Sequence, residues 1–391
     1  MAKKQNSKFG KVLFSLFAFL IGTVGSFYLV NYFSLPLTDE VSVTDEVYYS
    51  KDPSGASGNV DISSYGADLS IHFLELGNKY TGDCTFIQTP EADILIDCGS
   101  KSNSISTVSN YLNQYVTDGI LEYVIVTHAH QDHYAGFATS TKIDSIFDLY
   151  QCETIIDFAM TNQKSTSTMY SNYQRELADE VAQGANHYTA LDCINGANGA
   201  TNLYEIGDGI TLEILDSYYY SNKASSENDY SVCCMISQDT GDGNSKNFLF
   251  TGDLEGDGEE YLVELNQLPK VELYKAGHHG SKTSSTGALV SVIQPEVVCV
   301  CCCAGSSEYT KVSENQFPTQ EFIDRIAPYT DQVFVTTMCI DYANNEFTSF
   351  NGNIVYLSKV DDYAVACSNN NTVLKDSDWF KNNRTCPEVW K

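Results

Sequence analysis

The chain begins with a long apolar run that differs from everything after it. The nineteen residues from Val12 to Val30 carry no charge, and a helix of that length is about enough to cross the hydrocarbon core of a bilayer. Four basic residues precede the run: Lys3, Lys4, Lys8 and Lys11. We therefore predict a signal anchor and transmembrane helix over residues 1–37, with the rest of the chain outside the cytoplasm. The alternative is a cleaved signal peptide, which would make the protein secreted.

The next segment, residues 38–66, shows no regular spacing of apolar residues. It is rich in Ser, Asp, Gly and Thr, and it contains the tetrapeptide TDEV twice. Such a composition is typical of a flexible acidic linker, which would hold the following domain away from a membrane surface.

From residue 67 onward, apolar runs typical of strands alternate with apolar residues at helical spacing. The predicted strands are 71–76, 85–88, 94–96 and 123–126, and the first helical spacing runs through Ile105, Val108, Leu112 and Val116. This alternation predicts a layered α/β domain over residues 67–366. We expect the polar segment 160–190 to be a helical insert or a mobile flap, and residues 367–391 to be a loosely held C-terminal tail.

The net charge narrows the class of partners. The chain has 22 Lys and Arg residues against 51 Asp and Glu residues, so its formal charge is −29. Proteins that bind nucleic acid through its phosphates usually carry a basic patch, so we expect no strong non-specific DNA binding. A hydrophobic share of 42% is enough to build a core, which excludes global disorder.

The cysteines indicate a buried interior more than a disulfide framework. Their number, thirteen, is odd, and several lie in apolar runs, as in the segment 299–303. Buried cysteines on strands are the simplest interpretation. Cys367 and Cys386, at the two ends of the C-terminal tail, are the candidates for a disulfide.

The strongest chemical signal follows the predicted strand at 123–126. His128, His130, Asp132 and His133 lie within six residues, although the whole chain has only seven histidines. Imidazole and carboxylate groups are ligands that zinc, manganese and iron accept. A loop after a strand can direct the first two histidines to one metal ion and the Asp-His pair to a second, so the sequence indicates a dinuclear metal site.

Two later motifs also follow apolar strands. Asp253 ends the segment FLFTGD, and the pair His278–His279 lies between glycines after the apolar segment 271–276. Adjacent histidines point in different directions, so one can bind a metal ion while the other contacts a substrate. Lys275, just before the pair, is either a contact for a phosphoryl oxygen or a solvated lysine at a strand end.

The order of these motifs resembles the metallo-β-lactamase superfamily, and within it the hydrolase domain of the competence DNA-uptake protein ComEC. The likeness is carried by HxHxDH at 128–133, TGD at 251–253 and HHGS at 278–281, together with LIDCG at 95–99. It covers roughly residues 70–360. The resemblance implies an α/β fold of four layers, αββα, preceded here by the transmembrane helix.

Residue by residue, the resemblance implies a centre of two divalent metal ions, with zinc expected and manganese as the alternative. The implied ligands are His128, His130, Asp132, His133, Asp253 and His278. Asp253 would bridge the two ions, and His279 stays open as the alternative to His278. Asp97 would bond to a ligand histidine and fix its orientation.

The chain departs from the superfamily pattern at two places. Many members supply another histidine between the Asp-His pair and the TGD aspartate, and the only candidate here is His187, in a polar stretch. A later motif of the ComEC branch, which ends in His-Pro, reads Gln316-Phe317-Pro318 in this chain. The first metal ion would then be completed by water or substrate.

The resemblance implies a hydrolase that cleaves phosphodiester bonds with a hydroxide bridging the metal ions. With the predicted N-terminal anchor, the expected function is that of a membrane-anchored, extracytoplasmic enzyme. Asp132 would orient the nucleophile or accept a proton, and His279 and Lys275 would contact a phosphoryl oxygen. The expected partners are a nucleic acid or an envelope polymer as substrate, and the membrane through the N-terminal helix.

Three alternatives stay open. A phosphorylcholine esterase-type enzyme acting on teichoic acid would suit the 26 tyrosines, since aromatic rings bind ammonium groups. The run Tyr218-Tyr219-Tyr220 is the candidate for such a contact. Hydrolysis of a β-lactam or thioester would use the same metal site, and a non-catalytic surface protein would bind metal without turnover.

Overall fold

The computed structural model describes residues 48–50, 57–59 and 65–391. The chain divides into two units, residues 1–45 and 46–391, and all described residues belong to the second unit. The predicted transmembrane helix over residues 1–37 lies outside the described residues. Within the described ranges, no helix combines the length and apolar character needed to cross a membrane.

The described residues form two sheets, and the first has ten strands in the order β2-β1-β18-β17-β3-β4-β5-β6-β7-β8. Its strands are β1 (Tyr48–Ser50), β2 (Ser57–Asn59), β3 (Leu69–Phe73), β4 (Thr85–Gln88), β5 (Asp93–Ile96), β6 (Ile120–Val126), β7 (Gln151–Asp157), β8 (Asn186–Thr189), β17 (Ile354–Lys359) and β18 (Asp362–Cys367). The strands from β5 to β8 are parallel, and the other neighbours are antiparallel.

The second sheet has eight strands in the order β16-β15-β14-β13-β12-β11-β10-β9. These are β9 (Leu203–Gly207), β10 (Ile210–Ile214), β11 (Cys234–Asp239), β12 (Ser245–Phe250), β13 (Leu273–Lys275), β14 (Val297–Ala304), β15 (Val333–Asp341) and β16 (Glu346–Ser349). Its central strands, β12 to β15, are parallel. Each sheet therefore has a parallel part whose strands end at a common edge.

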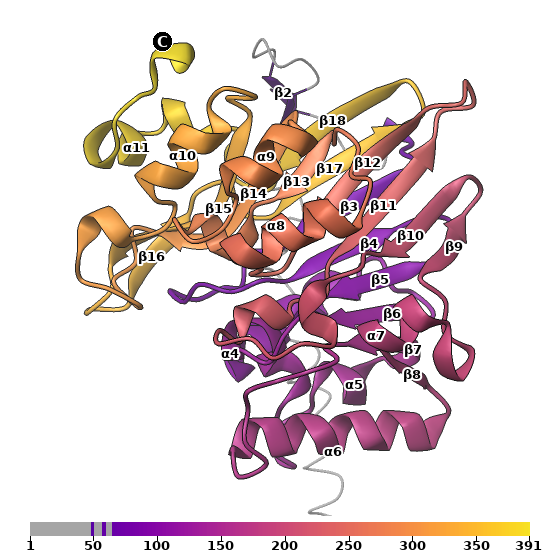
Figure 1. The fold of residues 1–391 in the computed structure, drawn as a ribbon. Coiled ribbons are helices and arrows are strands. Elements are labelled where there is room, and N and C mark those ends of the chain that lie inside the picture. Colours follow the sequence, from indigo (N-terminus) through magenta and orange to yellow (C-terminus); the bar gives the residue numbers. More distant parts are fainter. Residues whose placement is uncertain (1–47, 51–56, 60–64) are drawn as a thin grey trace, which may run out of the picture. The chain divides into compact units, whose positions relative to one another are not determined.

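Helices connect the parallel strands of both sheets. They are α3 (Ile105–Leu112), α4 (Gln131–Tyr134), α5 (Ile146–Leu149), α6 (Thr168–Gln183), α8 (Gly256–Leu265), α9 (Gly287–Ile293) and α10 (Gln320–Ile326). Two further helices lie elsewhere in the chain: α7 (Ala190–Asn195) between β8 and β9, and α11 (Asp378–Asn383) after β18. Figure 1 shows α8, α9 and α10 together along the second sheet, and α6 beside the strands β7 and β8 of the first. The segment 160–190 thus contains a regular helix, which is the first of its two predicted forms.

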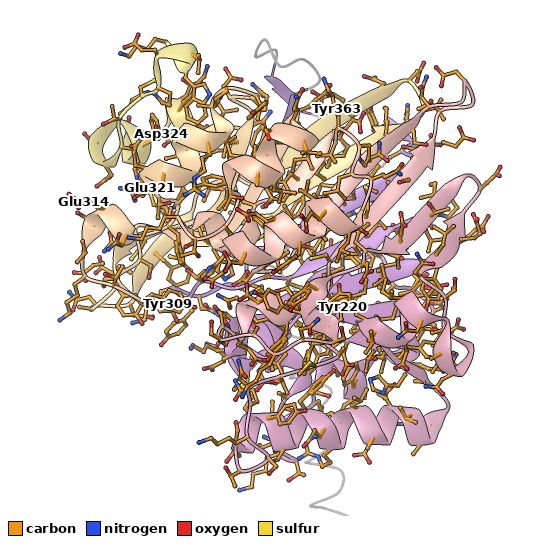
Figure 2. All side chains as sticks on the ribbon, viewed as in Figure 1. Tyr220, Tyr309, Glu314, Glu321, Asp324 and Tyr363 are labelled. Atoms are coloured by element: carbon orange, nitrogen blue, oxygen red, sulfur yellow. The ribbon has the colours of Figure 1, made fainter. Side chains whose placement is uncertain are left out.

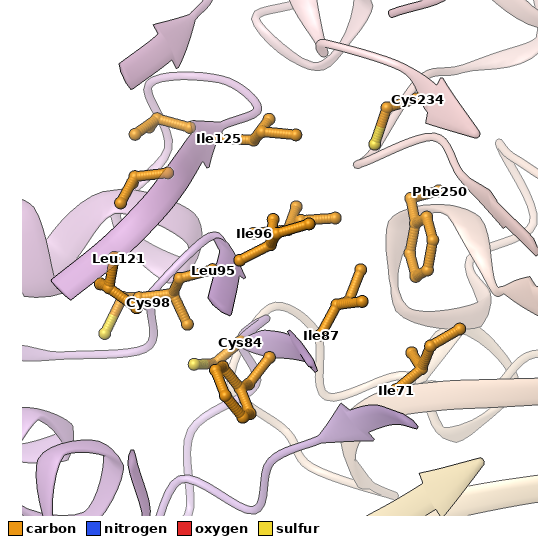
Figure 3. Close-up of a cluster of buried hydrophobic side chains, with 14 of the residues drawn as sticks. Ile71, Cys84, Ile87, Leu95, Ile96, Cys98, Leu121, Ile125, Cys234 and Phe250 are labelled. Carbon is orange, nitrogen blue, oxygen red and sulfur yellow. The ribbon is translucent and has the colours of Figure 1, made fainter. Parts of the chain in front are cut away.

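The main core lies between the two sheets. Ile71, Ile87 and Ile125 of the first sheet and Cys234 and Phe250 of the second belong to one buried cluster (Figure 3). Burying an aliphatic or aromatic side chain of this size stabilises the fold by about 1.5–3 kcal/mol. The sheets are therefore held face to face by their apolar side chains.

A second core lies between the second sheet and its helices. Val298 and Val300 of β14 pack with Leu289 of α9 and Phe322 of α10. Because neighbouring residues on a strand point to opposite faces, the cysteines at 299 and 301 face the other core instead. A strand covered on both faces explains the continuous apolar run VVCVCCCA.

The cysteines are accordingly part of the packed interior. All thirteen lie in the described ranges and all are free thiols, eleven of them buried. The candidate disulfide between Cys367 and Cys386 is not formed: both are free thiols, with Cys367 buried at the end of β18 and Cys386 in the segment before the last turn of the chain.

Two segments are more ordered than their polar composition suggested. Leu374, Phe380 and Trp390 of the C-terminal segment are buried in the second core, so this segment is packed and not loosely held. Within residues 38–66, β1 pairs with β18 and β2 pairs with β1, so part of the expected linker joins the first sheet. Apolar residues pack the C-terminal segment, and backbone pairing joins residues 48–50 and 57–59 to the sheet; composition reveals neither.

Candidate metal centre

The candidate site residues come from the carboxyl ends of parallel strands in both sheets. In the first sheet, Asp97 follows β5 and the segment 127–133 follows β6. In the second sheet, Asp253 follows β12, and His278 and His279 follow β13. This edge is where ligands bind in open parallel sheets. The structure therefore brings motifs that are far apart in the sequence to one place.

The turn after β6 is held by backbone hydrogen bonds from two neighbouring loops. The Asp83 N–H donates to the Asp132 carbonyl over 2.9 Å, and the Cys98 N–H donates to the His133 carbonyl over 2.7 Å. Gly99 passes so close that a Cβ atom there would lie 1.7 Å from the Asp132 carbonyl oxygen. Only glycine fits at this position, and the close contact fixes the backbone that carries Asp132 and His133.

The side chain of His133 is oriented by Asp97. Its Nδ1 lies 2.7 Å from Asp97 Oδ2, and Asp97 also accepts the N–H and the hydroxyl of Thr127. Because Nδ1 faces a carboxylate, the neutral ring would carry its proton there, which makes Nε2 the nitrogen that a metal ion would bind. Nε2 is buried 3.1 Å from Asp253 Oδ2 and makes no hydrogen bond to a described residue. This is the contact that the predicted orienting role of Asp97 requires.

His279 is held in the same way from the second sheet. Its Nδ1 lies 2.9 Å from the Cys301 carbonyl and 3.2 Å from Asp83 Oδ1. Its Nε2 lies 3.4 Å from Asp253 Oδ2 and 3.5 Å from Asp132 Oδ2, and it too lacks a hydrogen bond within the described part of the chain. The side chain is fully buried. Two imidazoles thus present unbonded Nε2 atoms to the same carboxylate.

His278 lies at the opening of the site. Its side chain is 21% exposed, and its Nε2 is 3.9 Å from Asp253 Oδ2. Its Nδ1 contacts the Thr283 hydroxyl at 3.0 Å and Glu255 Oε1 at 3.4 Å. Both histidines of the pair have positive φ angles, 45° and 56°, a costly conformation for residues with a side chain. The geometry favours His279 as a ligand, where the sequence preferred His278, and leaves His278 partly exposed at the opening of the cluster.

His128 and His130 adjoin this cluster on the first-sheet side. His128 Nε2 lies 3.1 Å from His130 Nδ1, and the rings of His128 and His133 have centroids 4.2 Å apart. His128 Nδ1 contacts the Thr127 hydroxyl at 3.1 Å. The structure therefore gathers the three histidines of the HxHxDH motif, while the role of the first two at a separate metal ion stays a prediction.

Lys275 has partners that the sequence did not suggest. Its ammonium forms an ion pair with Asp83, donates to the Gly252 carbonyl over 3.2 Å and lies 3.9 Å from Asp253 Oδ1. The side chain is only 4% exposed, which excludes a solvated lysine. Since the ammonium is engaged with buried carboxylates, it neutralises charge within the site, and the predicted contact with a phosphoryl oxygen has no support in this arrangement.

The cluster carries more negative than positive charge. Its carboxylates are Asp83, Asp97, Asp132 and Asp253, and its one ammonium is Lys275. Burial alone would lower the pKa of His133, but Asp253, Asp97 and Asp83 raise it to about 10. Burial likewise opposes the effect of Asp253 and Asp83, which hold the pKa of His279 well above its usual range. The carboxylates therefore favour bound cations, and a metal ion can replace the protons on the two imidazole rings.

The residues present fit a divalent metal ion. Asp83, His133, Asp253 and His279 each offer a ligand atom, and these atoms lie within 4.8 Å of one another. Imidazole nitrogen and carboxylate oxygen suit zinc, and also manganese. With Asp83 paired to Lys275, the residues best placed to hold an ion are His133, His279 and Asp253, with Asp132 beside them.

His187 has a different partner. Its Nε2 lies 2.9 Å from Asp157 Oδ1, and the Tyr173 hydroxyl donates to the other oxygen of Asp157 over 2.8 Å. This neighbourhood orders the end of β7 and β8. A role for His187 as the additional metal ligand therefore gains no support from its contacts.

Two residues of the site carried no clear signal in the sequence analysis. Asp83 ends a TGD tripeptide at 81–83, identical to the one at 251–253, and this repeat is a signal that could have drawn attention to it. A third copy, at 240–242, lies in an exposed turn, so the repeat alone does not identify a site residue. The Tyr309 hydroxyl donates to Asp132 Oδ2 from a loop after β14. That loop has no periodic pattern, so no sequence feature indicates the contact.

Comparison with known families agrees with the motifs. Residues 77–143 match the family model described as the metallo-beta-lactamase superfamily. "Recombination protein 2" of Haemophilus influenzae is 25% identical over 304 residues, which cover 74% of this chain and 32% of that protein. "ComE operon protein 3" of Bacillus subtilis is 29% identical over 249 residues, 59% of this chain and 28% of the relative. The chain thus spans about a third of the length of these relatives, and the resemblance inferred from the motifs is confirmed.

Solved structures with a similar fold include two of named proteins. The metallo-beta-lactamase fold protein YhfI from Bacillus subtilis is 12% identical, with a TM-score of 0.37, over 69% of this chain and 96% of that one. The metallo-beta-lactamase SMB-1 is 15% identical, with a TM-score of 0.32, over 53% of this chain and 76% of its own.

Proposed function

Because the chain has the metallo-β-lactamase α/β fold with two sheets, we propose that it is a metal-dependent hydrolase that cleaves phosphodiester bonds. One observation carries the proposal. The buried Nε2 atoms of His133 and His279 converge on the carboxylate of Asp253, and the opposite side of each ring is already bonded. Such an arrangement leaves the lone pairs of both rings available to a metal ion.

In the proposed mechanism, divalent ions held there would act as Lewis acids and lower the pKa of an attacking water. The chain's own residues supply orientation and charge. Asp97 fixes the ring of His133, and Asp83 helps to fix the ring of His279. The side chain of Asp132 is 17% exposed, which makes it the cluster's carboxylate nearest to solvent. We assign Asp132 to orienting the attacking water or accepting its proton.

A nucleic-acid phosphodiester is the substrate favoured by this chain's likeness to "Recombination protein 2" and "ComE operon protein 3". The net charge of −29 opposes the approach of a polyanion. We therefore expect binding to depend on bound metal ions and to weaken when they are removed.

A second candidate substrate carries a cationic head group next to its phosphoester. The ring of Tyr218 stacks on that of Tyr261 with centroids 4.3 Å apart, and Tyr219 meets both edge-on. Burial, then the nearby carboxylates of Asp229 and Asp257, raise the pKa of Tyr219. Aromatic faces beside carboxylates suit an ammonium group, which favours phosphorylcholine-type esters of envelope polymers as the alternative.

The proposed location is outside the cytoplasm, on a membrane anchor formed by residues 1–37. The uncharged run 12–30 and the lysines before it support this placement. Fractionation of cells that express the full chain, beside a chain without residues 1–37, tests it. Recovery of both forms in the same soluble fraction would overturn the anchor.

The activity is tested on the purified full chain loaded with zinc or manganese. The substrates are bis-p-nitrophenyl phosphate, p-nitrophenyl phosphorylcholine and single-stranded DNA, and the control is the His130→Ala, Asp253→Ala double variant. We expect metal-dependent diester cleavage that the double variant lacks. A preference for the choline ester would select the second candidate, and bound metal without turnover of any of the three would overturn the proposed function.

A further inference from the structure

A loop after β14, residues 305–319, places an aromatic side chain against the candidate metal centre. The Tyr309 hydroxyl donates to Asp132 Oδ2, the carboxylate oxygen that also lies 3.5 Å from His279 Nε2. The residue as a whole is nevertheless 55% exposed. In Figure 2, Tyr309 lies on the second-sheet part of the molecule, on the side toward α4. The helix α4 carries Asp132. The phenol oxygen therefore lies at the boundary between the cluster and solvent.

Phe317, on the same loop, joins Tyr309 to the two histidines of the second sheet. Its ring centroid is 5.7 Å from that of Tyr309 and 5.7 Å from that of His278. It is also 5.8 Å from the ring of His279. These contacts form one aromatic wall over the HHGS motif. Tyr309 is its outermost member, with its hydroxyl directed to Asp132.

The loop is fixed on both sides of Tyr309. Before it, Glu308 accepts the Thr81 N–H over 2.9 Å and pairs with Lys101 at 3.7 Å. After it, Arg384 donates to the carbonyls of Pro318 over 2.9 Å and Gln316 over 2.6 Å. A guanidinium with several donors is well suited to hold a run of backbone carbonyls. The phenol is thus held in position from both ends of its loop.

Arg384 comes from the C-terminal segment, which is itself anchored. Its guanidinium lies 4.9 Å from the centre of the Trp379 ring, and Phe380 beside it is buried in the second core. The Thr385 N–H donates to Gln320 of α10 over 2.8 Å. The segment that ends the chain therefore positions a loop of the candidate site.

We propose that Tyr309 is a substrate-contacting residue whose phenol donates a hydrogen bond to a non-bridging oxygen of the phosphoryl group, with Arg384 as a positioning residue. A phenol is a hydrogen-bond donor at neutral pH, and it is already directed to an anionic oxygen, that of Asp132. A phosphoryl group entering the site presents the same kind of acceptor at the same opening, so the phenol exchanges one anionic oxygen for another. This assignment rests on the proposed function, because it requires a phosphoryl group at the cluster.

The test compares the full chain with Tyr309→Phe, Arg384→Gln and their combination, all zinc-loaded. Tyr329→Phe is the matched control, since this tyrosine is also partly exposed, at 37%, and lies after α10 outside the site. Four quantities are measured for each protein: zinc content, melting temperature, kcat and KM on bis-p-nitrophenyl phosphate, and the Kd for inorganic phosphate. Phosphate binding requires no turnover, so it reports on Tyr309 even if the wild-type chain fails to cleave the diester.

For Tyr309→Phe we expect kcat/KM to fall about tenfold to a hundredfold, the loss typical of one hydrogen bond to a charged group. Phosphate binding should weaken in the same direction, while zinc content, melting temperature and Tyr329→Phe stay at wild-type values. Arg384→Gln should lower kcat/KM less, and the combination should lose no more than Tyr309→Phe alone, because both act through one contact.

Three results would overturn the assignment. Wild-type kcat/KM and phosphate affinity in Tyr309→Phe would remove the contact with substrate. Loss of zinc from that variant would show that the phenol serves only to hold Asp132. Additive losses in the combined variant would remove the positioning role of Arg384. Absence of diester cleavage by the wild-type chain, with phosphate binding still sensitive to Tyr309, would instead count against the proposed function alone.

Discussion

Two of the three Thr-Gly-Asp tripeptides of the chain, at residues 81–83 and 251–253, approach the same two histidines from opposite sides. Asp253 lies near the Nε2 atoms of His133 and His279, at 3.1 and 3.4 Å. Asp83 lies near their Nδ1 atoms, at 3.7 and 3.2 Å, and pairs with Lys275. One aspartate therefore faces the centre of the site, and the other stands behind the rings.

The difference follows from strand direction. Residues 251–253 come after β12, at the carboxyl end of a parallel strand. Residues 81–83 come before β4, which is antiparallel to β5, so its beginning lies at the edge where β5 ends. Identical residues thus reach one site from the start of one strand and the end of another. The comparison shows that the role of a carboxylate depends on the side of the imidazole that it meets.

The difference between the two aspartates is tested most directly by the substitution Asp253→Asn. This change removes the anionic oxygen at the centre of the cluster, so we expect loss of metal binding and a fall of at least about 10³-fold in activity. Zinc content and diester hydrolysis measure both effects. Asp83→Asn, purified beside it, should keep measurable metal binding, and equal losses in the two variants would show that both aspartates are ligands.

The two adjacent histidines give the next largest difference. His279→Ala removes a buried Nε2, and we expect metal affinity to fall by about 10- to 100-fold or more, as for losses of ligand-supporting groups at metal sites. His278→Ala should stay within a few-fold of wild type in affinity while lowering turnover. Competition with a chromophoric chelator measures the affinities. The reverse ranking would restore the ligand preferred from the sequence.

The role of Asp83 as the charge partner of Lys275 can be tested through the stability of the fold. Asp83→Asn leaves the Lys275 ammonium buried without its carboxylate, so we expect the free energy of unfolding to fall by about 3–5 kcal/mol. Adding Lys275→Met should recover part of that loss. Urea unfolding of the metal-free proteins measures it, with Lys391→Ala, which breaks an exposed pair, as the neutral control. No recovery in the double variant would refute the pairing.

The smallest effect is a pH dependence of stability that arises beside the tripeptide at 251–253, in the helix α8 that follows it. Glu259 of α8 accepts the N–H groups of Ser285 and Thr286, yet burial raises its pKa from 4.5 to about 7. The folded state therefore binds this proton more tightly than the unfolded chain. The stability that the proton provides is present at low pH and is lost, by about 3 kcal/mol, as pH rises from about 4.5 to 7. The melting temperature of Glu259→Gln should lack that decline between pH 5 and 8. A profile parallel to that of the wild-type chain would contradict this role of Glu259.

The parts of the site that the sequence predicted well are local. His128, His130, Asp132 and His133 lie within six consecutive residues, so one strand and one turn are enough to gather them. The resemblance also supplied Asp97, whose carboxylate meets His133 in the structure. The fold class was predictable as well, because the parallel strands are short apolar runs separated by helices.

The parts that escaped prediction depend on contacts between distant segments. Burial separates His279 from His278 through two unusual φ angles, which no spacing reveals. Lys275 meets Asp83 only once both sheets are stacked, so a strand-end lysine could not be recognised as buried. Tyr309 and Arg384 lie in polar segments whose order comes from a few aromatic anchors and from backbone carbonyls.

The strand order of the first sheet also has a consequence for synthesis of the chain. β17 and β18 lie between β3 and β1, so the sheet closes only with strands made late in translation. Until then, β3 keeps an unpaired edge beside an apolar face, a template for association with other chains. Because the core between the sheets includes Ile354 and Tyr356 of β17, the nascent protein completes its interior only after the metal-site motifs have all been synthesised. The first sheet therefore cannot close before residues 354–367 have been synthesised, and the edge of β3 stays open to other chains until then.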